Sequence, residues 1–288
     1  MKLQSDTHLT STLDKLDTLP AMPAIAQKLL TLPLNTNEGE DAMLRLIEHD
    51  PQLSAKIIGL ANTPALGSSH QTTSIRDAAM RLGMTRVKSI AIGIATMSAL
   101  TKMPQGRLCV QDLWQHSLAV AMSMRTIAQY MPEDIRPDDG QIFLAGLLHD
   151  IGYLVLAYLD TKRSDELHAR MAANPLRPIQ ELELELLNVT HSELGAQLGF
   201  NWGLPPGIIT ALRHHHTPET PGAAEEKLLI RLINVAEKIL PVFGISELLA
   251  ADISDQEWDS LNIPTEKQEE IRSKVLAQAD QAKQLATS

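Results

Sequence analysis

Apolar side chains recur at helical spacing along most of the chain. Residues 22–32 carry them at positions i, i+3, i+4 and i+7, which is the pattern of an amphipathic helix. Residues 85–100 are apolar nearly all round, so we expect a buried helix there. No stretch alternates apolar and polar residues convincingly enough to indicate a strand. The pattern therefore predicts an all-α fold, a multi-helix bundle.

Start and stop signals divide this pattern into segments. Asp50-Pro51 predicts an N-cap followed by proline at the first helical position. Ser74 and Asp77 resemble a capping box, and Gly83 is expected to end that helix. The remaining helices are expected near residues 37–50, 51–62, 111–130, 139–150, 152–160, 162–172, 178–188, 191–201, 205–213 and 223–240, with residues 245–262 left unassigned.

The pattern breaks between residues 101 and 110, where Pro104 and Gly106 occur. We therefore predict an N-terminal helical lobe over residues 1–105 and a helical core over residues 106–288. A polar last helix near residues 265–285 is expected at the periphery of that core.

Composition narrows the possible functions. The net charge of −10 argues against a nucleic-acid-binding surface, which needs clustered Lys and Arg, although a local pocket could still bind a small anion. The single cysteine, Cys109, allows no internal disulfide and is expected to be a small core residue. Residues 1–20 lack the pattern of a signal peptide, so we expect a cytoplasmic protein.

The longest apolar run, residues 142–159, contains His149 and Asp150 at its middle. Placing that pair inside a bilayer would cost several kcal/mol, about 3 kcal/mol for the aspartate alone, so we expect two buried helices and no membrane contact. Inside a protein the pair also needs partners. These are either an internal hydrogen bond or a divalent metal, for which imidazole and carboxylate together suit Fe, Mn, Zn or Mg.

Other histidines and acids fall on separate predicted helices. Each has an ordinary alternative, such as a core histidine, a helix-end residue or a solvated acid. Asp112 precedes His116 by about one helical turn, so both can project from one face. Helix bundles build metal sites from imidazoles and carboxylates that converge from several helices. The candidates are Asp112, His116, His149, Asp150, His191, His214, His215, His216 and Glu237.

Residues 143–152, Phe-Leu-Ala-Gly-Leu-Leu-His-Asp-Ile-Gly, resemble the core motif of the HD superfamily. The order of the candidates resembles that of the HD-GYP branch, a group of metal-dependent phosphohydrolases. That resemblance implies metal ligands at His116, His149, Asp150, His191, His215, His216 and Glu237, with Asp112 as an extra acidic ligand and His214 outside the pattern.

Three further motifs resemble successive signatures of the HDOD family, over residues 15–240. They are Leu19-Pro-Ala-Met-Pro-Ala-Ile-Ala, Ile47-Glu-His-Asp-Pro-Gln-Leu and Ser74-Ile-Arg-Asp-Ala-Ala-Met. The resemblance implies a bacterial regulatory module in which the N-terminal lobe is specific to the family. Such a module acts in signal transduction through a protein partner.

The chain departs from the HD-GYP pattern at three places. Tyr153 stands where that pattern has a phosphate-binding lysine, Thr217-Pro-Glu replaces the Gly-Tyr-Pro motif, and Glu237 replaces an aspartate. Cyclic di-GMP hydrolysis is therefore not expected. Three hypotheses remain open. They are a signalling module, a metal-dependent hydrolase of a small phosphate ester or nucleotide in which Asp150 orients the nucleophile, and a nucleic-acid regulator, which the acidic charge opposes.

Overall fold

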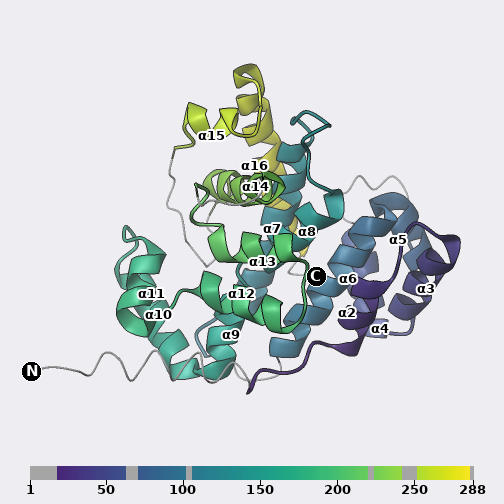
Figure 1. Cartoon of the computed structure of the whole chain (residues 1–288), viewed down its shortest axis with the longest axis horizontal. Helices are drawn as coiled ribbons and strands as arrows, with labels where there is room; N and C mark the ends of the chain where they lie inside the picture. The colour runs from purple at the N-terminus through teal and green to yellow at the C-terminus, as the bar shows by residue number, and fades with distance from the viewer. Residues whose placement is uncertain (1–17, 63–70, 102–105, 220–223, 242–251, 286–288) are drawn as a thin grey trace, which may run out of the picture.

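The computed structural model describes residues 18–62, 71–101, 106–219, 224–241 and 252–285 (Figure 1). Within these ranges the chain is helical and contains no strand, which confirms the predicted all-α class. The N-terminal helices are α2 (Ala24–Thr31), α3 (Asn37–Glu48), α4 (Pro51–Ala61), α5 (Ile75–Leu82) and α6 (Met84–Leu100). Those that follow are α7 (Val110–Ala128), α8 (Asp139–Leu148), α9 (Ile151–Leu159), α10 (Thr161–Ala173), α11 (Ile179–Leu187), α12 (His191–Asn201), α13 (Pro206–His214), α14 (Ala224–Ile239), α15 (Asp255–Asp259), the 3-10 helix η3 (Thr265–Lys267) and α16 (Gln268–Leu285).

Local signals set several helix ends where the sequence predicts them. The Asp50 carboxylate accepts hydrogen bonds from the backbone amides of the second and third residues of α4, at 3.1 and 3.0 Å. The Ser74 hydroxyl accepts one from the amide of Asp77 at 3.0 Å and begins α5. Gly83 separates α5 from α6 at a φ of 93°, a conformation that costs glycine little.

Helix α6 joins the N-terminal helices to the rest of the protein, because it packs against α2 on one side and α8 on another. Buried apolar residues on both sides of the predicted boundary belong to one continuous cluster. The indole Nε1–H of Trp202 also donates to the carbonyl oxygen of Pro20 at 3.0 Å. The division at residue 105 stays a prediction, and Pro104 lies outside the described residues.

The most apolar segment, Asp139–Leu159, is long enough to cross a membrane by length and composition alone. In the structure it breaks into α8 and α9 at the His149-Asp150 pair, and 89% of its most apolar window is buried. This is the packing of a core element, as the sequence predicts.

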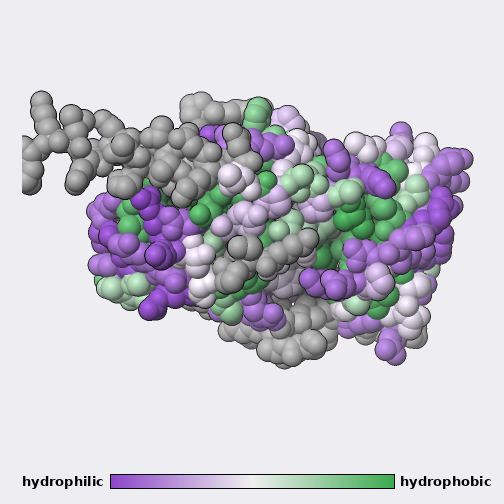
Figure 2. Space-filling view, turned by 90° about the horizontal axis from the view of Figure 1, so that it is seen from below, coloured by the Kyte–Doolittle hydropathy of each residue, from purple (hydrophilic) through white to green (hydrophobic). Residues whose placement is uncertain are grey.

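The periphery differs from expectation at Cys109, which is exposed rather than in the core. It is the N-cap residue of α7, and its neighbour Leu108 is the residue buried in the core there. The last helix, α16, buries Ile271 and Val275 and packs along α7. The face of the molecule in Figure 2 is hydrophilic over much of both ends and carries apolar residues between them.

Candidate metal centre

Seven of the predicted ligands converge on one place in the bundle. Each offers a nitrogen or oxygen atom to one of two neighbouring groups, and within a group these atoms lie within 4.8 Å of one another. The first group contains His116, His149, Asp150 and Glu237, and the second contains His191, His215 and His216.

The first group depends on close approach between α7 and α8. His116 lies within α7 and His149 caps the C-terminus of α8, and their Nε2 atoms are 3.3 Å apart. Glu237 of α14 brings its Oε1 atom to 3.1 Å from the His149 Nε2. A Cβ at Gly146 would lie 2.5 Å from the Cα of Ala121, so only glycine allows α7 and α8 this contact.

The second group forms where α12 and α13 meet. A capping box between Thr190 and Glu193 begins α12 and places His191 at its first position. The Nε2 atoms of His215 and His216 each lie 3.2 Å from the His191 Nε2.

Asp150 lies between the two groups. Its Oδ2 is 3.2 Å from the Nε2 of His149 and 3.4 Å from that of His116. Its Oδ1 is 3.6 Å from the Nε2 atoms of both His191 and His215. One carboxylate therefore presents one oxygen to each group, which is how a carboxylate bridges two cations.

Backbone hydrogen bonds orient a histidine of each group toward the centre. The Nδ1–H of His149 donates to the carbonyl oxygen of Gly146, and that of His215 to the carbonyl oxygen of Leu212, both at 2.8 Å. Because carbonyl oxygens only accept, each Nδ1 carries a hydrogen, and the Nε2 of each ring points into the centre. In His215 that Nε2 carries a lone pair, whereas burial alone would lower the pKa of His149 but the carboxylates of Asp150 and Glu237 raise it, so a proton occupies its Nε2 until a cation replaces it. Lone pairs at 3.2–3.3 Å repel unless a cation or proton lies between them. Two ligands on a tetrahedral metal with bonds of about 2.0–2.1 Å are about 3.3 Å apart.

Burial and charge support the same assignment. Asp150 and Glu237 are buried, and their carboxylate oxygens accept no hydrogen bond of good geometry from the described residues. Burial alone would raise the pKa of Asp150, but the neighbouring His149 holds it well below its ordinary value. Burial, reinforced by His216, lowers the pKa of His215 to about 4, so this imidazole is neutral at pH 7 and able to bind a metal. Four unsatisfied buried carboxylate oxygens are what a bound cation would neutralise.

Glu183 of α11 is a residue of this site that the sequence analysis missed. It is fully buried, and its Oε1 accepts a hydrogen bond from the Nδ1–H of His191 at 2.7 Å. Carboxylates in this position orient metal-binding histidines. A signal was present, because Glu183 shares the buried face of α11 with Ile179, Leu182 and Leu187.

Two candidate ligands, Asp112 and His214, do not belong to either donor group. Asp112 is half-buried on α7, and neither it nor His214 is among the converging residues. Asp112 shares the face of His116 but lies one turn earlier, about 6 Å along the helix axis, so it is displaced from the centre along the helix. Tyr153 is fully buried and stacks on His191, with ring centroids 4.3 Å apart. Tyr153 therefore packs against His191 and supplies no positive charge at the place where the HD-GYP pattern has a lysine.

The chain matches the model of the HDOD domain over residues 19–218. An uncharacterized protein of Treponema pallidum (strain Nichols) is 23% identical over 226 residues, which are 78% of this chain and 42% of that protein. The chain thus spans less than half the length of this relative.

Three solved structures share the fold. A Marinobacter aquaeolei VT8 protein, whose name proposes a role in signal transduction, has a TM-score of 0.78 and 27% identity over 100% of this chain and 62% of its own. An HDOD domain protein of unknown function from Geobacter sulfurreducens has a TM-score of 0.72 and 22% identity, over 94% and 97% of the two chains. A Shewanella amazonensis SB2B protein, whose name proposes metal-dependent phosphohydrolase activity, has a TM-score of 0.66 and 20% identity, over 98% of both chains.

Proposed function

Since the chain belongs to the HDOD family, we propose that it is a cytoplasmic bacterial signal-transduction module, acting through a protein partner and built around a two-cation centre. The observation that carries the metal assignment is the position of Asp150, with one carboxylate oxygen toward each histidine group. The likeness to the Marinobacter protein supports the signalling role.

The surroundings of His191 favour regulation over hydrolysis. The HD-GYP pattern places a lysine three residues after the His-Asp pair to bind substrate phosphate. Here Tyr153 is packed under His191, where it adds apolar contact and no charge. Phosphoryl transfer depends strongly on positive groups that neutralise the phosphate, and this substitution removes one of them.

A metal-dependent phosphohydrolase is the second candidate, and the complete donor set favours it. Two bound divalent cations would acidify a water and polarise a phosphoryl oxygen. The chain's own contribution would be to hold the donors in place, with Asp150 orienting the nucleophile between the two groups. The substrate class would be a small phosphate ester or nucleotide.

Elemental mass spectrometry of protein purified without a histidine tag tests the metal centre. We expect two equivalents of Fe, Mn, Zn or Mg, and a loss of metal in Asp150→Ala. Asp150→Asn keeps the side-chain volume, and its circular dichroism and melting temperature show whether the fold survives. Absence of metal from the folded wild-type protein after reconstitution with each cation would refute the proposal.

A turnover assay on the metal-loaded protein separates the two roles. With bis(p-nitrophenyl) phosphate and nucleoside monophosphates as substrates, the signalling role predicts no steady hydrolysis. Hydrolysis that disappears in Asp150→Asn would establish the enzyme instead. Hydrolysis that survives this change would identify a contaminant.

A further inference from the structure

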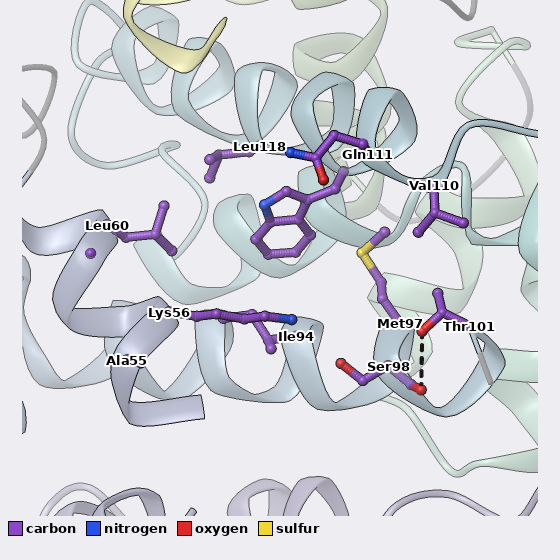
Figure 3. Close-up of a pocket in the computed structure, with 12 residues that line it drawn as sticks. Ala55, Lys56, Leu60, Ile94, Met97, Ser98, Thr101, Val110, Gln111 and Leu118 are labelled. Atoms are coloured by element: carbon purple, nitrogen blue, oxygen red, sulfur yellow. Dashed lines mark hydrogen bonds between the residues drawn. The ribbon is translucent and has the colours of Figure 1, made fainter. Parts of the chain in front are cut away.

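A second site lies where α4, α6 and α7 meet (Figure 3). The cavity has a volume of about 580 Å³, within the range of about 300–1,000 Å³ typical of small-molecule sites. None of the residues that line it belongs to the metal centre. It is therefore a cavity separate from that centre.

The walls of this groove are mainly apolar. Leu60 of α4, Ile94 and Met97 of α6, and Trp114 and Leu118 of α7 line it. Trp114 is half-buried, so part of its indole remains available for contact. Methionine and tryptophan side chains together favour a flat apolar body, since sulfur and aromatic faces both pack well against rings.

The polar lining residues of the groove include one cation, Lys56, together with Ser98, Thr101 and Gln111, whose side chains can donate and accept. Figure 3 shows the Lys56 side chain extended from α4 past Ile94, with Gln111 approaching from the α7 side. Both side chains are exposed, and neither has an ion pair or hydrogen bond within the described part of the chain. Among the described residues that line the groove, Lys56 alone carries a formal charge, and it is positive in a chain whose net charge is −10.

We propose that this groove binds a small organic anion with a flat apolar body. The carboxylate, sulfonate or phosphate of such a molecule would pair with Lys56, while its body would pack between Met97 and Trp114. The occupant would contact α4 and α6 on one side and α7 on the other. It would therefore join the N-terminal helices to the helix that carries His116.

Fluorescence titration with 8-anilinonaphthalene-1-sulfonate tests this proposal, because the probe combines an aromatic body with one anionic group. Its uncharged analogue N-phenyl-1-naphthylamine has the same ring system without the sulfonate. We expect saturable binding of the sulfonate to the folded wild-type protein. Lys56→Gln should weaken it about three- to fivefold, the effect of losing one exposed ion pair. Binding of the analogue should change by less than about twofold.

Gly59 provides a variant that fills the groove. A Cβ built at this exposed position of α4 meets no atom within 4 Å, so Gly59→Leu is expected to fold normally and abolish saturable binding. Lys28→Gln, which removes an exposed charge from α2, is the matched control and should bind as the wild type does.

Three outcomes would overturn the proposal. Equal binding of the sulfonate to wild type and Gly59→Leu would place the probe elsewhere. If Lys56→Gln weakened binding of both probes equally, the anionic group of the ligand would not pair with Lys56. A wild-type dimer in sedimentation that becomes monomeric in Gly59→Leu would show that a second copy covers the groove.

Discussion

The hydrogen bond from His191 to Glu183 should control metal affinity in the second histidine group alone. The Nδ1–Oε1 distance is 2.7 Å and both side chains are fully buried, so water cannot replace the carboxylate. Glu183→Gln keeps an acceptor oxygen and loses the charge. Glu183→Leu loses both, and leaves the Nδ1–H of His191 without its partner.

The expected losses follow from that difference. Changes to the partners of metal-binding histidines reduce metal affinity about 10- to 100-fold, equivalent to about 1.4–2.7 kcal/mol. Glu183→Gln should lie near the lower figure, because the tautomer of His191 is still fixed. Glu183→Leu should lie near the upper one. The group around His149 should keep its affinity, since Glu183 makes no contact with it in the structure.

Cobalt(II) titration in competition with a chromophoric chelator measures the two affinities separately. Glu185→Gln is the matched control, because it changes the same charge on the exposed side of α11. Wild-type affinity at both groups in Glu183→Leu would refute the reasoning. An equal loss at both groups would also refute it, since that result would indicate general damage to the fold.

Other predictions concern packing, pH and the extra acid. Gly152→Ala should lower the melting temperature strongly, because the new Cβ would lie 1.9 Å from the carbonyl oxygen of His191, whereas Gly59→Ala, which meets open space, should not. The metal-free protein should lose stability as pH falls from about 6.5 toward about 4. Unfolded His215 takes up a proton there that the folded residue, with its pKa of about 4, does not. The effect is at most about 1.4 kcal/mol per pH unit for that proton, and a smaller slope in denaturant unfolding of His215→Gln would confirm its source. Asp112→Ala should leave the metal content measured by elemental mass spectrometry unchanged, and a loss of metal would restore Asp112 as a ligand.

Local chemistry made the helices predictable. The N-caps Asp50 and Ser74 bond to backbone amides within three residues of themselves, so the adjacent sequence is enough to predict them. The break between α8 and α9 also falls at the predicted polar pair, because His149 and Asp150 interrupt an otherwise apolar segment. Such signals need no knowledge of distant parts of the chain.

The sequence predicts only part of how the metal-donor side chains converge. The sequence contains residues of the right chemistry in a recognisable order, but the position of each residue along and around its packed helix decides which of them reach the centre. Asp112 and His116 lie about one turn apart, yet only His116 is among the converging residues. Glu183 lies on the apolar face of α11, which is a sequence signal for burial, but its hydrogen bond to His191 depends on how α11 packs.

The sequence by itself determined the helical class, most helix boundaries and the chemical types of the metal donors. Tertiary structure decided how those donors divide into two groups and that Asp150 lies between them. It also created the groove beside Lys56, whose walls come from three helices. The physical reason is that helix formation depends on neighbouring residues, whereas these sites depend on interhelical distances set by close contacts such as that of Gly152 with His191.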